Sequence, residues 1–251
     1  MRVVLDIDDE LVGREPDDAD LARLYAYPEG RTWLRANMVS TLDGAATGPD
    51  GKTGTINNDA DRQVFMLLRA LADAVVVGAG TARVEGYGRP RPVRGVRASL
   101  RSGRPAAPAL VVVSRSANLP TKLTLPAEDD GSGEVFLVTC TAAGDRALDA
   151  ARAVLGEDHV LVADGDTVDL PAMLAHLHAL GMNRLLTEGG PHLLRDLTAA
   201  GLVDEICLTV VPHVLGGTHP RILAGAEVSQ EMRPRLLLEA DGTLLGRWSR
   251  P

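Results

Sequence analysis

The 251-residue sequence predicts an α/β fold: an open, mostly parallel β-sheet with helices on both faces and an antiparallel edge at its C-terminal end. Three observations support this prediction. Short apolar runs alternate along the chain with segments whose apolar residues recur at helical spacing, which is typical of parallel sheets. The run from Asp73 to Gly78 is β-branched, unbroken and closed by glycine, as expected of a strand buried on both faces. The tail from Arg235 to Trp248 predicts two strands around the turn Ala240-Asp241-Gly242.

The first 31 residues are acidic and rich in turn-forming residues. We expect them to form an extension that lies on the surface, with a short helix from Asp18 to Tyr25. Residues 32–251 are the predicted main domain, because no internal repeat or linker divides them.

The main domain is expected to open with a buried strand over Leu34–Leu42 and a loop from Ala45 to Asn58. Asn58 is a suitable N-cap for a helix over Asp59–Leu71, in which Val64, Leu67, Leu68 and Leu71 recur at helical spacing. The later elements are expected in this order: strand Asp73–Gly78, a long functional loop Gly86–Pro108, strand Leu110–Val113, an irregular segment Pro120–Gly133, strand Val135–Thr139, helix Asp145–Leu155, strand His159–Val162, helix Leu170–Leu180, strand Arg184–Thr187, helix Pro191–Ala200 and strand Val203–Val211.

Composition narrows the classes of function. A formal charge of −8 and only 3% aromatic residues argue against a nucleic-acid partner, which needs a basic face or stacking rings. No apolar stretch reaches the length of about 18 residues needed to span a membrane. Cys140 and Cys207 lie far apart in apolar runs, which suits buried free thiols in the cytoplasm and excludes a Cys-rich zinc site. The scattered histidines provide no spacing for a metal site.

Ligands of open parallel sheets bind beyond the carboxyl ends of the strands, and three strand ends here carry suitable residues. The first is Gly78-Ala79-Gly80-Thr81, where small residues allow close approach to the main chain and free amides attract a phosphate. An ordinary tight turn is the alternative.

The second strand end is Glu188-Gly189-Gly190-Pro191, in which Pro191 suits the first turn of a helix. Amides of Gly189 and Gly190 at the positive end of that helix would favour a pyrophosphate. Glu188 ends a buried strand and needs a partner, so it is either a functional carboxylate or a cap for nearby amides. The third strand end is Asp43-Gly44, which taken alone is a turn signal.

In combination, these segments resemble the reductase domain of riboflavin biosynthesis, the C-terminal part of a bifunctional deaminase–reductase in the dihydrofolate-reductase-like superfamily. The resemblance runs from about Arg31 to the C-terminus. The deaminase signature, His-x-Glu with Pro-Cys-x-x-Cys, does not occur, so a stand-alone reductase is expected. The matching segments are Thr41-Leu42-Asp43-Gly44, Asp73 to Thr81, Glu188-Gly189-Gly190-Pro191 and Gly201-Leu202-Val203-Asp204-Glu205, followed by Pro212 and Gly216-Gly217.

The resemblance implies an NADPH-dependent enzyme without a metal. The candidate catalytic carboxylates are those of Asp43, Glu85 and Glu188, and the implied substrate-facing residues are Thr53, Arg69 and Glu188. The implied cofactor-binding residues are Val39, Thr55, Gly78, Gly80, Thr81, Glu85, Ser114, Gly189, Gly190, Pro191, His192 and Leu193.

The resemblance also implies a reaction. The family reduces the ribose of 5-amino-6-(5-phosphoribosylamino)uracil to a ribityl chain, with hydride passing from nicotinamide C4 to the ring-opened ribose carbon. This chain departs from the family at Glu85-Gly86-Tyr87-Gly88, where Asp-Asp or Asp-Asn-Pro is usual, and at Thr55, where tryptophan is frequent. Three hypotheses follow: this pyrimidine reductase, a paralogue that reduces a pterin such as dihydrofolate, and a catalytically silent NADPH-binding protein.

Two features bear on substrate and assembly. Arg89, Arg91 and Arg94 lie in the long loop, and they favour a phosphorylated sugar if they reach the cleft. Dimers are common in the family, so a homodimer is expected through the edge made by the apolar C-terminal strands, Leu236–Leu238 with Leu244 and Leu245.

Overall fold

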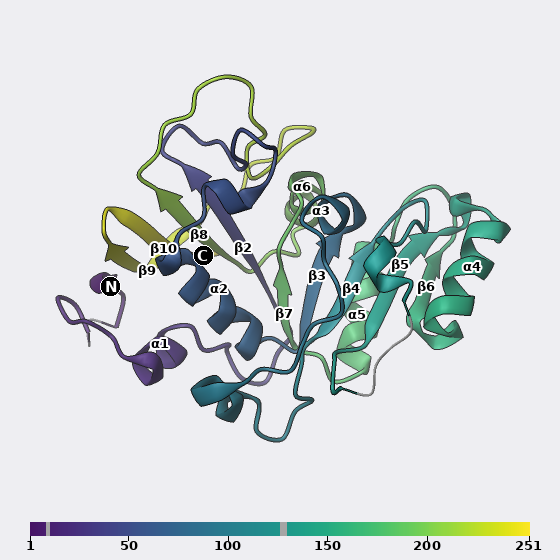
Figure 1. The fold of residues 1–251 in the computed structure, drawn as a ribbon, viewed down its shortest axis with the longest axis horizontal. Helices are drawn as coiled ribbons and strands as arrows, with labels where there is room; N and C mark the ends of the chain where they lie inside the picture. The colour runs from purple at the N-terminus through teal and green to yellow at the C-terminus, as the bar shows by residue number, and fades with distance from the viewer. Residues whose placement is uncertain (9–10, 126–129) are drawn as a thin grey trace.

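The computed structural model describes residues 1–8, 11–125 and 130–251. One ten-stranded sheet runs through this part of the chain (Figure 1). Its strand order is β1-β9-β10-β8-β2-β7-β3-β4-β5-β6. Every neighbouring pair from β8 to β6 is parallel, whereas β10 is antiparallel to β8 and β9, and β1 is antiparallel to β9. The predicted open, mostly parallel sheet with an antiparallel edge is therefore confirmed.

The bounds of the elements are as follows. The strands are β1 (Arg2–Asp6), β2 (Trp33–Thr41), β3 (Ala74–Gly78), β4 (Ala109–Val113), β5 (Val135–Cys140), β6 (Val160–Ala163), β7 (Arg184–Thr187), β8 (Glu205–Val211), β9 (Arg233–Ala240) and β10 (Thr243–Ser249). The α-helices are α1 (Asp18–Leu24), α2 (Asp59–Leu71), α3 (Ala79–Val84), α4 (Asp145–Leu155), α5 (Leu170–Ala179) and α6 (Pro191–Ala199). The 3₁₀-helices are η1 (Thr53–Thr55), η2 (Gly95–Arg101), η3 (Thr121–Leu123), η4 (Thr141–Ala143) and η5 (Glu157–His159).

Local sequence signals place the helix ends. The side chain of Asn58 accepts a hydrogen bond of 3.0 Å from the amide of Asp61, which satisfies one free donor in the first turn of α2. The bounds of α2, α4 and β7 are those predicted, and most other ends differ by one or two residues. The irregular segment expected at 120–133 contains η3, and its residues 126–129 lie outside the described part of the chain.

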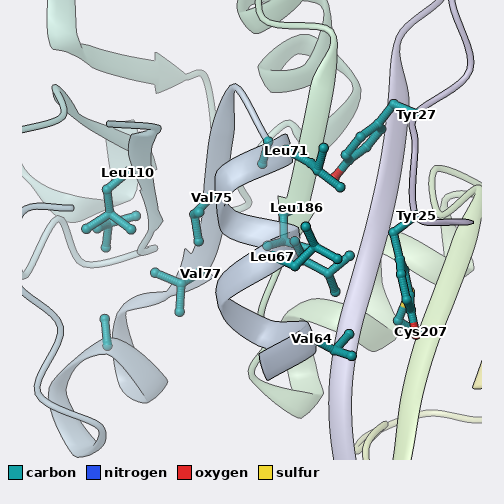
Figure 2. Close-up of a cluster of buried hydrophobic side chains, with 14 of the residues drawn as sticks. Tyr25, Tyr27, Val64, Leu67, Leu71, Val75, Val77, Leu110, Leu186 and Cys207 are labelled. Carbon is teal, nitrogen blue, oxygen red and sulfur yellow. The ribbon is translucent and has the colours of Figure 1, made fainter. Parts of the chain in front are cut away.

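Helices cover both faces of the sheet, as predicted. On one face, α1, α2, α3 and α4 enclose an apolar cluster with β3, β4 and β7, part of which Figure 2 shows around Leu67, Val75 and Leu186. On the other face, α5 and α6 pack on the same strands through residues such as Met173 and Leu194. Burying a leucine contributes roughly 2 kcal/mol, so these clusters hold the parallel strands in register. No described helix is long and apolar enough to cross a membrane.

The N-terminal segment does not lie on the surface as expected. Its first residues form β1, which pairs with β9, and Leu21 and Leu24 of α1 are buried. Tyr25 and Tyr27 are also buried, and Figure 2 shows both beside the strands of the main domain. The helix expected from Asp18 is present, but Val3, Leu21, Leu24, Tyr25 and Tyr27 of this segment complete one face of the core.

A buried ion cluster explains why this segment packs inward. Arg35 in β2 is 0% exposed at its side chain and donates from Nε to Glu205 Oε1 at 2.5 Å. The remaining Arg35 donors bind the carbonyls of Tyr25 and Ala26, while Arg247 donates to the carbonyl of Leu24. Burial alone would lower the pKa of Arg35, but the Glu205 carboxylate raises it above the usual value. The main chain of the N-terminal segment therefore satisfies charges buried in the sheet.

The antiparallel end of the sheet is one strand longer than expected. Because β1 pairs with β9, the C-terminal hairpin of β9 and β10 lies between β1 and β8. Leu236 and Leu238 are buried in the core. The C-terminal strands are therefore not the free edge through which we expected two copies to meet, and β1 holds that place.

Candidate active site

The two glycine-containing strand ends lie side by side, because β3 and β7 are neighbours in the sheet. The amide of Gly78 donates to the carbonyl of Gly189 at 2.7 Å, and the amide of Glu188 donates to the carbonyl of Val76 at 3.0 Å. The peptide bond between Gly189 and Gly190 is cis. Any Cβ at Gly190 would overlap Oγ1 of Thr81, so the closeness of the two tips depends on glycine at this position.

A cavity of about 1050 Å³ opens beside these tips. It lies at the carboxyl ends of β3 and β4, next to α3 and α6. Helix α6 begins at its wall without a side-chain cap, so the amides of His192 and Leu193 remain available at its positive end. Eight of the predicted cofactor residues line the cavity: Gly78, Gly80, Thr81, Ser114, Gly190, Pro191, His192 and Leu193.

Glu188 is buried and bound on both oxygens. Its carboxylate accepts two hydrogen bonds from Arg69, Nε to Oε1 at 2.7 Å and Nη2 to Oε2 at 2.6 Å. The hydroxyl of Tyr87 donates to Oε2 at 2.5 Å. The Arg69 guanidinium also lies 4.3 Å from the Phe65 ring centroid and 5.3 Å from that of Tyr87. We call Arg69, Tyr87 and Glu188 the carboxylate cluster.

The charge of Glu188 raises both pKa values in the carboxylate cluster. Burial lowers the pKa of Arg69, but the attraction of Glu188 more than offsets this and holds the pKa above its usual value. Burial and the Glu188 charge raise the pKa of Tyr87, so its hydroxyl stays protonated and remains a donor. Sequence reasoning paired Arg69 with Glu188 at a common ligand but missed Tyr87, whose only signal was its position between two glycines.

The loop before α2 is fastened to the end of α3. Glu85 caps α3 and accepts the amide of Thr53 on Oε1 at 2.9 Å. Thr53, which was predicted to face the substrate, thus contacts Glu85, which was predicted to be catalytic. Thr55 differs, because its exposed hydroxyl donates to Asp50 Oδ1 at 3.0 Å within the loop itself.

Asp43 forms a clamp between two loops. Its Oδ1 accepts from the Thr41 hydroxyl at 2.5 Å, and its Oδ2 accepts from the amides of Gly216 and Leu215 at 2.6 and 3.1 Å. These bonds, led by that of Thr41 and then Gly216, lower the pKa of Asp43. The turn at Asp43-Gly44 is therefore tied to the segment that follows β8.

One predicted residue, Val39, and one that the sequence analysis missed, Arg115, also belong to this region. Val39 is buried against Ile56 and Val211, so its side chain lies in a small apolar cluster. Arg115 follows Ser114 at the end of β4, lines the cavity, and forms no side-chain ion pair with any described residue. Its signal in the sequence was its place directly after a strand end.

Comparison with known proteins identifies the family of the chain. The family model of the RibD C-terminal domain matches residues 32–243. The chain is 30% identical over 210 residues to the 2,5-diamino-6-ribosylamino-4(3H)-pyrimidinone 5′-phosphate reductase of Methanothermobacter thermautotrophicus, covering 83% of this chain and 91% of that protein. It is 30% identical over 192 residues to the reductase of the same name from Archaeoglobus fulgidus, covering 74% and 83%.

Solved structures show the same fold. A pyrimidine reductase-like protein from Corynebacterium diphtheriae superposes with a TM-score of 0.81 at 25% identity, over 92% of this chain and 98% of that one. RibD from Acinetobacter baumannii superposes with a TM-score of 0.66 at 19% identity, over 89% of this chain and 59% of that one.

Proposed function

The chain belongs to the family of the RibD C-terminal domain, and from this premise we propose that it is an NADPH-dependent reductase that converts the ribose of a phosphoribosylaminopyrimidine to a ribityl chain. The observation that carries the proposal is the contact of Gly78 with Gly189 and Gly190, directly next to the carboxylate cluster. A dinucleotide site and a polar substrate site would then share one edge of the sheet.

The cavity beside Thr81 and Gly190 suits a dinucleotide. Its volume of about 1050 Å³ is ample, and the uncapped start of α6 presents amides where a pyrophosphate would bind. When bound, NADPH supplies the hydride for the ribose carbon that ring opening exposes. The residues of the chain would hold the two reacting carbons about 3–3.5 Å apart and exclude water.

Arg115 supports NADPH over NADH as the cofactor. An arginine near the adenosine ribose accommodates the extra phosphate of NADPH in many dinucleotide sites. Arg115 lines the cavity next to Ser114, the residue assigned to the adenosine end, and no described carboxylate neutralises it. Arg83 lines the same cavity, and its Nη1 donates a hydrogen bond to the carbonyl of Asn118.

Among the three candidate carboxylates, Glu85 is best placed to move a proton. Both oxygens of Glu188 and both of Asp43 accept hydrogen bonds, whereas Oε2 of Glu85 accepts none from the described residues. We therefore assign proton transfer to Glu85, in line with general acid–base catalysis by a partly exposed carboxylate. Glu188 would orient Arg69 and Tyr87 toward the substrate. Thr53 would lie beside the same substrate, held there by the hydrogen bond of its amide to Glu85.

The substrate phosphate needs a cation, and Arg89 is a candidate. It follows Tyr87 by two residues, and its Nε is buried without a hydrogen-bond partner in the described structure. The archaeal relatives are named for a 5′-phosphate substrate that carries an amino group at C2 of the pyrimidine. We propose the phosphoribosylaminopyrimidine as substrate, with the C2-amino form and the uracil form as the two versions to compare.

The experiment follows the absorbance of reduced nicotinamide in the presence of each substrate. Consumption of NADPH with either phosphoribosylaminopyrimidine, and none with dihydrofolate, supports the proposal, and the faster pyrimidine identifies the natural version. Consumption with dihydrofolate alone would replace it by a pterin reductase. Tight NADPH binding without turnover on any of them would make the chain a silent cofactor-binding protein.

Two further parts of the proposal concern assembly and location. We propose a homodimer that meets at β1, where Val4 and Leu5 are exposed on the outermost strand. Light scattering that gives the mass of one chain at micromolar concentration would refute it. We also propose a cytoplasmic location, supported by two buried, unpaired cysteines, Cys140 and Cys207.

A further inference from the structure

A second cavity, of about 870 Å³, lies at the opposite end of the same strands. Asp73, which precedes β3, and Arg184, which begins β7, both line it. The candidate active site sits at the other ends of β3 and β7, beyond Gly78 and Thr187. The two cavities are therefore separated by the length of the strands, and the proposed reaction does not use this one.

Arginines dominate the wall of this cavity. Arg31, Arg101, Arg104 and Arg184 line it, together with the carboxylates of Glu29, Asp73 and Glu134. Glu29 and Glu134 are exposed, whereas the Asp73 side chain is only 14% exposed. Asp73 is saturated, because it accepts Arg104 Nη1 on Oδ1 at 2.8 Å and the amides of Asn183 and Arg184 on Oδ2 at 3.0 and 2.9 Å. Four arginines thus face three carboxylates in the cavity lining, and the most buried of these carboxylates is already paired.

Arg101 has no carboxylate partner. Only 4% of the residue is exposed, yet it forms no ion pair with any described residue. Its Nε donates to the carbonyl of Pro105 at 2.6 Å and its Nη1 to the carbonyls of Ala70 and Ala72, while Nη2 donates to no described residue. Burial, and then the charge of Arg104, lower the pKa of Arg101 to about 10. An anion in the cavity would relieve this repulsion.

The arginines also have a structural role, which accounts for part of their charge. Arg101 and Arg104 bind carbonyls at the end of α2, where the helix dipole favours cations. That role does not involve Arg184 or Arg31. The guanidinium of Arg184 forms no ion pair or hydrogen bond with a described residue, and Arg31 stacks 4.2 Å from the Trp33 ring centroid. These two are free to bind a ligand.

We propose that this cavity, lined by Arg31, Arg101, Arg104 and Arg184, binds the phosphate group of a small metabolite. Guanidinium groups pair with phosphate oxygens in a planar, two-bond geometry, and a phosphate carries nearly two negative charges at neutral pH. The cavity volume falls within the range of about 300–1,000 Å³ typical of pockets for small molecules, so the phosphate can be part of a molecule the size of a mononucleotide.

Isothermal titration of the full chain with inorganic phosphate tests the site. Arg184→Gln is the informative variant, because the Arg184 guanidinium forms no hydrogen bond or ion pair with a described residue and the variant should fold, which its melting temperature checks. Arg62→Gln is the matched control on the exposed face of α2. Arg115→Gln is a comparison variant that reveals any phosphate bound in the cofactor cavity, because it removes the arginine assigned there to the phosphate of NADPH.

The expected result is binding that Arg184→Gln weakens by about tenfold or more, with Arg62→Gln unchanged. Loss of binding in Arg115→Gln but not in Arg184→Gln would place the phosphate in the cofactor cavity and overturn the proposal. Equal affinity for acetate would overturn the choice of phosphate. The result does not depend on turnover, so it stands or falls separately from the proposed reductase activity.

Discussion

The amide of Gly78 donates a hydrogen bond of 2.7 Å to the carbonyl of Gly189, joining two strand ends that lie more than a hundred residues apart in the sequence. The same contact brings Gly190 against Thr81 at the wall of the larger cavity. The account of cofactor binding depends on this junction.

Gly190 variants test the junction first. A Cβ at this position would overlap Thr81 Oγ1, so Gly190→Ala should weaken NADPH binding by about tenfold or more, measured by fluorescence titration. Thr81→Ala removes the overlapping oxygen and should restore part of the affinity in the double variant.

Gly190→Asp and Gly190→Asn have side chains of the same shape, so the difference in NADPH affinity between them isolates the effect of charge. The aspartate should bind NADPH about tenfold more weakly, roughly 1.4 kcal/mol, because it faces the pyrophosphate. Equal affinities of this pair would contradict the assignment.

Tyr87→Phe tests the carboxylate cluster. The variant removes the donor to Glu188 Oε2 and keeps the ring against Arg69. A hydrogen bond to a charged group contributes about 1.5–3 kcal/mol, so kcat/KM for the pyrimidine should fall by about tenfold or more. The dissociation constant for NADPH should not change. A parallel loss of NADPH affinity would show that Tyr87 supports the fold and not the substrate.

Arg115→Gln tests the choice of cofactor. If its guanidinium binds the extra phosphate, the variant should lose about tenfold in affinity for NADPH and almost none for NADH. Arg62→Gln, on an exposed helix face, is the control. An equal loss for the two cofactors would exclude Arg115 as the selective residue.

Glu205→Gln tests the buried ion cluster. Glu205 and Arg35 are 3% and 0% exposed at their side chains, so removing the carboxylate leaves a buried cation unpaired. Breaking such a pair costs about 3–5 kcal/mol of unfolding free energy, which urea denaturation would measure. The exposed pair of Arg233 with Glu231, 3.7 Å apart, provides the control, and Glu231→Gln should cost about 1 kcal/mol or less.

Asp61 predicts a pH dependence of stability. Burial raises its pKa, and a hydrogen bond with Thr209 only partly opposes this. The folded state therefore holds the proton of Asp61 more tightly than the unfolded state does, and stability from this group is lost as pH rises through the raised pKa. Asp61→Asn should thus gain stability relative to the parent chain between about pH 4 and about pH 7. A constant difference across this range would refute the burial argument.

How far the sequence could predict the fold is clear from particular elements. The β-branched run of β3 and the apolar spacing of α2 depend on neighbours in the chain, and both were predicted closely. The position of β1 depends on β9, more than 220 residues away, and on the hidden charge of Arg35, neither of which leaves a local pattern. An acidic segment was therefore taken for a surface extension although it completes the core.

The candidate site divides in the same way. Glycine tips and strand-end carboxylates are visible as short motifs, and the structure brings most of the residues they predicted to one edge of the sheet. Tyr87 reaches Glu188 across 101 positions, so only the fold reveals it. The hydrogen bonds that occupy the oxygens of Asp43 and Glu188, on which our proposal of Glu85 for proton transfer rests, were equally invisible in the sequence.

A crystal structure of the chain with NADPH tests the central claim most directly. The account predicts that the pyrophosphate lies within hydrogen-bond distance of the amides of His192 and Leu193, between Thr81 and Gly190. A cofactor bound away from both glycine tips, or a pyrophosphate without main-chain contacts there, would contradict it.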